Sequence, residues 1–412
     1  MLPRLKRLLS TLTVLALLAA ELVATGAGNA AHAADARRPD DTARYLAGMQ
    51  PSAGSPEAAF TSDPAWRQHA GAFDQAWARF EKAQLSRIRG WRQQNLTSHR
   101  PTLLYYFSGP DFLYADAFFP EATTYILAGL EPIGPIPQIT AANHGALPGL
   151  RASLNSVLNL SFFRTREMRQ RLGSGQFAGT LPLLYIFLAR AGKTVQSTSL
   201  VRLKADGVAG PADGVAARGE VNGVKIDFTD AAPATAPAGT SAAGASSGAG
   251  PGAATVDGGG ATTVNVAPAA APPTGKLRTL YYFQGDVSNT GPGLEALMAF
   301  CRALGPADGF VKSASYLMHT GGFSKIRDFL VAQTELLLED DSGIPVQYFP
   351  AGEWDLSPHG RYLGPIALFP GRRQRQLDEL YARASPRPID FGIGYRYRQN
   401  ESNLLLAVKR MR

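Results

Sequence analysis

Two runs of consecutive apolar and aromatic residues constrain the fold of this chain most strongly. Residues 102–107 read TLLYYF and residues 278–283 read RTLYYF, and a glycine follows each run closely, Gly109 in the first case and Gly285 in the second. Strands that are apolar on both sides are typical of a parallel sheet covered on both faces. A glycine after such a strand allows the chain to turn sharply. Both runs therefore predict buried strands of an α/β sheet.

Helical and strand-like segments alternate after each run. Residues 111–119 and 293–304 read as helices, 122–132 reads as a strand, and 309–320 is undecided between the two. This alternation predicts a layered, mostly parallel α/β sheet. Near the end of the chain, residues 387–411 predict an antiparallel strand pair joined at residues 399–402, and residues 389–398 alternate apolar with small or charged side chains.

The composition divides the chain into blocks. Residues 231–275 hold almost no large apolar or charged side chain, so they predict a disordered linker rich in Ala, Gly, Pro, Ser and Thr. It separates a first α/β block, 63–230, from a second, 276–412, and a flexible leader, 34–62, precedes both. The repeated LYYF run suggests a diverged internal duplication. The alternative is two independent uses of ordinary strand and turn signals.

The N-terminus indicates where the protein is found. Residues 1–33 carry basic residues, then an apolar run, then small residues, which is the order of a secretory signal peptide cleaved near Ala33–Ala34. We therefore expect a secreted or periplasmic protein without a transmembrane span in its mature chain. The formal net charge of +8 is small for 412 residues, and the basic residues are scattered. A nucleic-acid partner is not expected, because it would require a concentrated basic patch.

The familiar catalytic signatures are missing. The sequence has no serine nucleophile elbow, no nucleotide-binding loop, no dinucleotide fingerprint and no HExxH motif. Its histidines are far apart, and the single cysteine, Cys301, lies in a helical segment where it reads as a small apolar residue. Neither a metal nor a cofactor is expected, and no motif assigns the chain to a characterised family.

Polar residues that follow the predicted strands are the first candidates for a ligand site. Ser108 and Asp111 come after the first LYYF run, Asp286 and Asn289 after the second, and Glu131 after the strand residues TTYILAGL at 123–130. Open parallel sheets bind ligands beyond the carboxyl ends of their strands, so these side chains are expected to face one ligand. The alternative is that the two aspartates only form turns or cap helices.

An acidic run is the second candidate. Asp340 and Asp341 follow Glu339 in LLLEDDSGIP, at the expected C-terminus of a helix. The helix dipole favours cations at that position, so either solvent, a nearby arginine or a bound cation has to compensate three carboxylates. Carboxylates and carbonyls are suitable ligands for a hard cation.

A loop with many aromatic and hydrogen-bonding residues is the third candidate. Its members are Glu353, Trp354, Asp355, Arg361 and Tyr362. Aromatic rings can face sugar rings while the charged groups engage hydroxyls, and Glu353 and Asp355 could act as the acid and the base of a glycosidase. The alternative is a rigid loop packed by its own aromatic side chains.

Together these features predict an exported protein that binds a ligand or glycan of a bacterial-type cell envelope. One alternative is a carboxylate-dependent hydrolase acting on an envelope glycan, ester or phosphate. Another is a structural or assembly protein of the envelope, which would pair through its C-terminal strands. The sequence shows neither whether the protein is an enzyme nor its oligomeric state.

Overall fold

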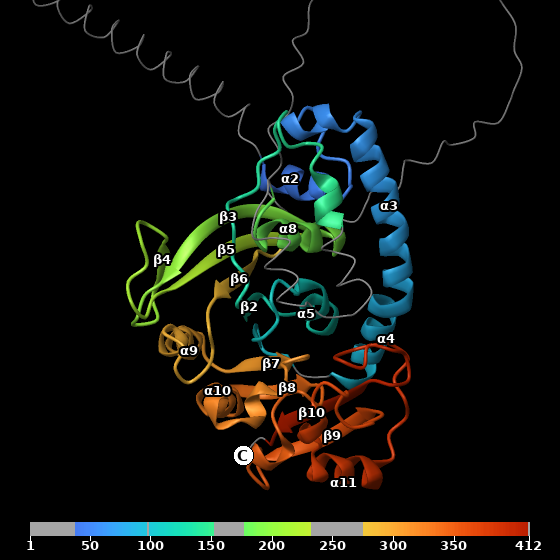
Figure 1. The fold of residues 1–412 in the computed structure, drawn as a ribbon, viewed down its shortest axis with the longest axis vertical. Helices are drawn as coiled ribbons and strands as arrows, with labels where there is room; N and C mark the ends of the chain where they lie inside the picture. The colour runs from blue at the N-terminus through green and yellow to red at the C-terminus, as the bar shows by residue number, and fades with distance from the viewer. Residues whose placement is uncertain (1–37, 97–98, 152–176, 232–274, 411–412) are drawn as a thin grey trace, which may run out of the picture.

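The computed structural model describes residues 38–96, 99–151, 177–231 and 275–410. These residues form one mixed, ten-stranded sheet with helices on both faces (Figure 1). The predicted α/β class, a mostly parallel middle and antiparallel C-terminal strands are thus confirmed. The proposed duplication stays a prediction.

The middle of the sheet is parallel, with the order β6-β2-β1-β7-β8. These strands span Thr102–Tyr105 (β1), Thr124–Gly129 (β2), Arg278–Gln284 (β6), Ala307–Val311 (β7) and Thr334–Glu339 (β8). In chain order they are the third, second, first, fourth and fifth parallel strands, which is the order of a doubly wound sheet. The two LYYF runs lie in β1 and β6, on either side of β2. Residues 63–230 and 276–412 therefore share one sheet.

Antiparallel strands extend the sheet at both margins. Beyond β6 lie Val221–Asp230 (β5), Lys193–Leu203 (β3) and Ala209–Pro211 (β4), and beyond β8 lie Asn403–Lys409 (β10) and Trp354–Gly360 (β9). The sequence placed the partner of β10 at residues 387–398, and that placement is wrong. A Cβ at Gly392 would lie only 1.6 Å from the carbonyl oxygen of Tyr397. The segment folds back on itself there, so β9 pairs with β10 instead.

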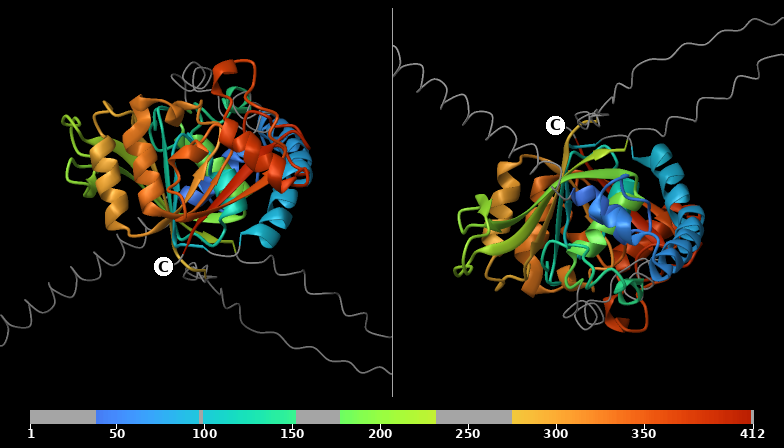
Figure 2. Two further views of the ribbon diagram at one scale, coloured as in Figure 1. Left: turned by 90° about the horizontal axis from the view of Figure 1, so that it is seen from below. Right: turned by 90° about the horizontal axis from the view of Figure 1, so that it is seen from above.

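Helices cover the two faces of the sheet (Figure 2). One face carries Leu294–Ala303 (α9) and Ser324–Gln333 (α10), and the other carries Pro39–Leu46 (α2), Pro64–Phe80 (α3), Phe112–Phe118 (α5) and Leu181–Arg190 (α8). A π-helical turn, Glu81–Leu85, connects α3 to Ser86–Asn95 (α4), and Arg375–Ala384 (α11) contacts β9. Each face of the sheet has its own apolar core.

The first long helix forms as its sequence suggests. Asp63 caps α3 by accepting a hydrogen bond from the backbone N–H of Ala65 at 2.7 Å, and Pro64 follows at the first helical position. The segment before it differs from the expected loose leader, because the described part of 34–62 contains α2. Tyr45 of α2 is fully buried, and its ring stacks on Trp66 of α3 at 5.7 Å. Burial of these aromatic rings fixes the segment to the domain.

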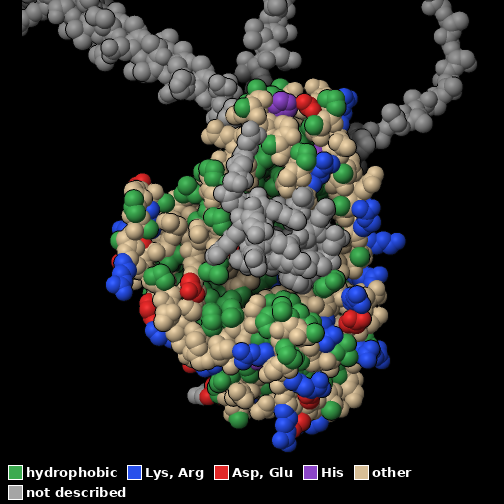
Figure 3. Space-filling view, viewed as in Figure 1, with side chains coloured by type: hydrophobic (Ala, Val, Ile, Leu, Met, Phe, Trp, Pro, Cys, Tyr) green, Lys and Arg blue, Asp and Glu red, His purple; other side chains and the backbone are tan. Residues whose placement is uncertain are grey.

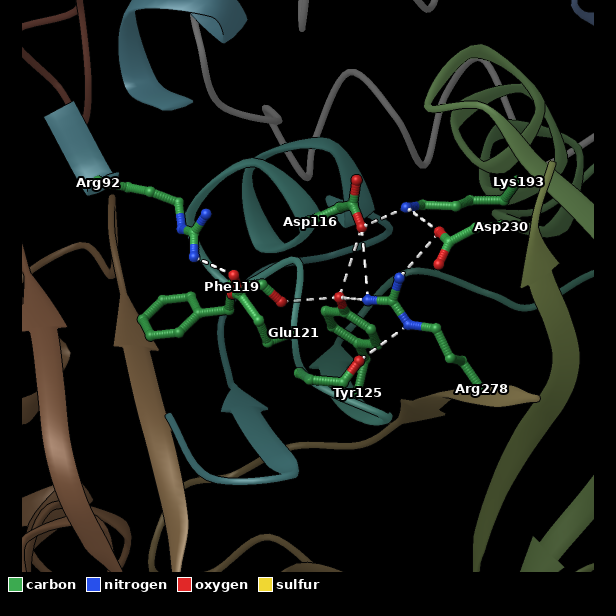
Figure 4. A network of polar contacts seen from close by, with 9 residues as sticks. Arg92, Asp116, Phe119, Glu121, Tyr125, Lys193, Asp230 and Arg278 are labelled. Carbon is green, nitrogen blue, oxygen red and sulfur yellow. Dashed lines mark hydrogen bonds and ion pairs between the residues drawn. The ribbon is translucent and has the colours of Figure 1, made fainter. Parts of the chain in front are cut away.

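Charged side chains at the amino ends of β2 and β6 form a paired network (Figure 4). The buried Arg278 donates hydrogen bonds to Asp230 Oδ1 at 3.1 Å and to the hydroxyl of Tyr125. Lys193 Nζ lies 2.7 Å from Asp230 Oδ1 and 3.0 Å from Asp116 Oδ1. This network joins the end of β5 to the start of β6. Most of the linker predicted at 231–275 lies outside the described residues, and its two flanking strands pair directly.

Two further observations concern the basic side chains on the surface and the length of the helices. Lysine and arginine side chains line the side of the molecule formed by α3 and α4 (Figure 3). Within the described ranges, no helix has both the length and the apolar character that crossing a bilayer requires.

Candidate functional site

A cavity of about 590 Å³ opens at the carboxyl ends of the parallel strands. We call it the switch-point pocket, because β1 and β7 are neighbours whose following segments lead to helices on opposite faces of the sheet. Its lining comes from the segments after β1, β2, β6 and β7, with contributions from residues 317–323, 366–369 and Tyr395. In doubly wound sheets, such a point is where the crevice for a ligand forms.

Glycines bring the backbone close together at the base of this pocket. Gly109, with φ +55°, follows β1, and Gly129 ends β2. A Cβ at Gly129 would lie 2.4 Å from Glu131 Oε2 and 3.0 Å from the Cα of Gly109. Any side chain there would displace the carboxylate of Glu131. The two glycines therefore make room for this carboxylate at the ends of the two central strands.

A buried ion pair lies beneath the pocket. Asp111 and Lys312 are 1% and 3% exposed, and Lys312 Nζ lies 2.8 Å from Asp111 Oδ2. The hydroxyl of Tyr105 donates to the same carboxylate oxygen at 2.8 Å, and burial together with this carboxylate raises the pKa of Tyr105 well above its usual value. Asp111 also caps α5, because its Oδ1 accepts the N–H of Tyr114 at 3.3 Å. Lys312 itself reaches the pocket wall.

The backbone around the pocket contains left-handed residues other than glycine. Phe107, Ser313 and Ser315 have φ values of +61°, +53° and +52°. Each such residue costs on the order of 1–3 kcal/mol, and residues of this kind cluster at binding and active sites. Hydrogen bonds hold them in place: Ser313 N–H donates to Asp340 Oδ2 at 2.9 Å, and Ser315 N–H donates to the hydroxyl of Tyr395 at 3.0 Å.

The acidic run supports this strained loop from outside the pocket. It begins with Glu339, the last residue of β8, so the expected helix C-terminus is wrong, and all three acids are buried rather than solvated. Asp341 accepts hydrogen bonds from Tyr316 OH at 2.7 Å and from Asn403 Nδ2 at 3.0 Å. Burial, reinforced by the charge of Asp340, raises the pKa of Asp341 to about 6. In the part of the chain that the structure describes, no cluster of His, Cys, Asp and Glu side chains is arranged to hold a metal.

The other residues singled out from the sequence are divided among several places. Ser108, Glu131 and Asp286 line the switch-point pocket, where the rule for parallel sheets places them. The carboxamide of Asn289 instead faces the start of α10, donating to Gly321 O at 2.7 Å and to Ser324 Oγ at 2.9 Å.

The aromatic loop does not reach the pocket. Trp354 and Asp355 belong to β9 at the margin of the sheet, where Asp355 pairs with Arg410 at 2.7 Å. Glu353 lies beside them in a second, smaller hollow. The N–H of Arg361 donates to the carbonyl of Ser402 at 2.8 Å, and the hydroxyl of Tyr362 accepts the N–H of Gln374 at 3.0 Å. These contacts are internal to the fold.

Sequence reasoning missed several residues of the pocket. Phe107 ends the first LYYF run, and Tyr395 lies in the expected C-terminal strand pair. Lys312, Ser313, Ser315 and Leu317 lie in the undecided stretch 309–320, and the remaining ones are Phe323, Leu368 and Phe369. One available signal was Lys312, a charge placed directly after the apolar residues of β7. The Oγ of Ser313 is buried without a hydrogen-bond partner among the described residues, and it belongs to the lining.

Comparison with known proteins identifies no relative of this chain. No protein-family model, no curated protein and no solved structure matches the chain. The functional argument therefore depends on the pocket itself.

Proposed function

We propose that this protein binds a small organic ligand with a largely apolar body in the switch-point pocket. The main support for this proposal is that a cavity of about 590 Å³ lies at the topological switch point of a doubly wound sheet. Ligand sites of proteins are typically clefts of about 300–1,000 Å³ with mostly apolar walls and a few polar groups. The order of basic, apolar and small residues in 1–33 supports an envelope location for this binding.

The walls favour an apolar ligand over a glycan. Phe107 and Phe323 lie with ring centroids 6.0 Å apart, and Val287, Leu317 and Phe369 add further apolar surface. A sugar presents hydroxyl groups around its whole ring, and each of them needs a hydrogen-bonding partner once it leaves water. The polar groups of this lining are concentrated at the strand ends, which suits a ligand with one polar end.

The two alternatives receive less support from the geometry. A glycosidase needs two carboxyl groups about 5–10 Å apart across the scissile bond. The two carboxylates considered for that role, Glu353 and Asp355, lie in and beside the smaller hollow next to β9 and do not line the switch-point pocket. An assembly protein would use the outer strands β4 and β9, which end the described sheet.

A neutral fluorescent dye tests the proposed function. Prodan, an uncharged naphthalene, should bind one site per chain with a blue-shifted emission, because the pocket shields it from water. Leu317→Trp adds bulk to the lining and should weaken dye binding at least about tenfold, whereas Leu304→Trp, on the partly exposed end of α9, should leave it unchanged. Absence of any saturable binding, or equal binding by both variants, would contradict a ligand site at the switch point.

A further inference from the structure

The carboxylate of Glu131 is buried at the pocket, and none of the described residues places a cation beside it. The residue is only 3% exposed and contributes to the lining. Among the described side chains, the hydroxyl of Tyr282 donates to it, at 3.4 Å from Oε2. Among the described residues, no lysine, arginine or histidine nitrogen lies within ion-pairing distance, 4.0 Å, of this carboxylate. A buried charge is normally paired, so the site lacks the expected counter-ion.

The charges around Glu131 do not supply one. Lys312 is the basic residue of the pocket lining, and its ammonium group is 2.8 Å from Asp111. Asp286 adds a second carboxylate at the exposed rim, where its Oδ1 accepts the N–H of Ser288 at 2.8 Å. Counted over the described residues, the carboxylates of the pocket and of the pair beneath it therefore outnumber the cations. An incoming positive charge would be attracted, and a negative one would be repelled.

The rest of the lining also suits a positive group. The aromatic side chains of Phe107, Phe323 and Tyr395 belong to it, and ring faces attract cations through their quadrupole. The hydroxyl of Ser313 has two acceptor lone pairs and is buried without a partner among the described residues. It could accept one N–H of an ammonium group while a carboxylate accepts another.

We infer that the switch-point pocket selects a ligand carrying an ammonium group, with Glu131 as its counter-ion. This inference rests on the proposed function and specifies the chemical class of the ligand: an organic amine with an apolar body. Gly129 is part of the arrangement, because a side chain there would collide with the carboxylate. The ammonium group lies at the ends of β1 and β2, and the apolar body extends between the aromatic walls.

Three probes with one carbon skeleton test this inference at pH 7.5. They are 4-phenylbutylamine, 4-phenylbutan-1-ol and 4-phenylbutyrate, which differ mainly in carrying a positive charge, no charge and a negative charge. Isothermal titration calorimetry should show the amine binding about 30-fold or more tightly than the alcohol, since a buried charge pair is worth 2 kcal/mol or more. The carboxylate should bind most weakly.

Glu131→Gln keeps the shape of the side chain and removes its charge. In this variant, the affinities for the amine and the alcohol should become equal within about threefold. Glu353→Gln is the matched control, because this glutamate lies in the separate hollow beside β9, and it should keep the full preference for the amine. The melting temperature of each variant shows whether it is folded. If Glu131→Gln does not fold, the ratio measured on the unaltered protein decides.

Each outcome bears on one proposal or on both. Equal affinities for the three probes would overturn the amine inference and would leave ligand binding in place. Tighter binding of 4-phenylbutyrate would overturn it as well and point to Lys312 as the group that meets the ligand. Failure of all three probes and of prodan would refute the proposed function itself.

Discussion

The two ends of the central strands contain similar charged residues in opposite arrangements. At the amino ends, Arg278 and Lys193 share the carboxylates of Asp116 and Asp230, so each charge has more than one partner (Figure 4). At the carboxyl ends, the pair beneath the pocket is single: Lys312 is the one cation within 4.0 Å of the Asp111 carboxylate among the described residues. Close to it lie a cavity and the hydroxyl group of Ser313, which none of the described residues hydrogen-bonds.

This difference separates a part that stabilises the fold from a part that suits a ligand. A network with several partners satisfies every buried charge and keeps β5 and β6 in register. The pocket end instead combines left-handed backbone at Phe107, Ser313 and Ser315 with a buried carboxylate at Glu131. Proteins depart from their local rules mainly at functional sites, and the cost is met by the surrounding structure. The contrast is thus an argument for function at the carboxyl ends.

Removal of Lys312 should have the largest effect on stability. Lys312→Met leaves the carboxylate of Asp111, which is 1% exposed, without a cation. Loss of one partner from a buried ion pair costs about 3–5 kcal/mol, and we expect the free energy of unfolding to fall by that amount at pH 7. Urea denaturation followed by circular dichroism measures the change.

A double variant provides the control for this prediction. Asp111→Asn combined with Lys312→Met removes both charges and keeps an oxygen that can cap α5. It should be more stable than Lys312→Met alone, because no unpaired charge remains buried. If Lys312→Met lowers the free energy of unfolding by less than about 1 kcal/mol, Asp111 does not depend on its single cation. That result would contradict the comparison of the two ends.

The sequence predicted the fold correctly where strands are buried on both faces of the sheet. The run TLLYYF begins with β1, and RTLYYF lies in β6, because continuous burial produces a clear local pattern. The pairing of β10 with β9 could not be predicted. The residues 354–360 read as a loop, because Pro358 and Gly360 are disfavoured in strands, and their position at the margin of the sheet permits them.

The sequence predicted only those residues of the site to which the rule for parallel sheets applies. Ser108, Glu131 and Asp286 follow strands directly, and the rule placed them at one edge. Ser313 and Tyr395 lie in the same pocket, because the left-handed backbone after β7 and a long C-terminal segment bring them there. Neither feature has a local sequence signal, since tertiary hydrogen bonds impose both.

The second prediction concerns a buried acid at the amino ends. Asp308, the second residue of β7, accepts the N–H of Arg100 and lies beside His99, and burial raises its pKa to about 7. The folded protein therefore holds this proton between about pH 4 and pH 7, where the unfolded chain has lost it. The stability that Asp308 contributes through this proton is fully present below about pH 4. It is lost as the pH rises to about 7, so the free energy of unfolding falls by roughly 2–4 kcal/mol.

Asp308→Asn tests this dependence, because the amide can still accept the N–H of Arg100 and does not titrate. Thermal unfolding from pH 4 to pH 8 should show a smaller decline in the variant than in the unaltered protein. Asp341→Asn is the corresponding variant at the carboxyl ends. Burial raises the pKa of Asp341 to about 6, so the stability that this acid contributes is lost by about pH 6, one unit earlier than that of Asp308. Parallel curves for Asp308→Asn and the unaltered protein would show that Asp308 ionises normally in the fold.

Removal of Lys193 should have the smallest effect, although its side chain is nearly as buried as that of Lys312, with 8% exposed against 2%. In Lys193→Met, Arg278 remains 3.1 Å from Asp230 and 3.6 Å from Asp116, so neither carboxylate is left without a cation. Asp230 is also 57% exposed and can be solvated. We expect a loss of about 1 kcal/mol or less in urea denaturation. A loss as large as that of Lys312→Met would mean that the number of partners does not distinguish the two ends, and that burial of the cation alone sets the cost.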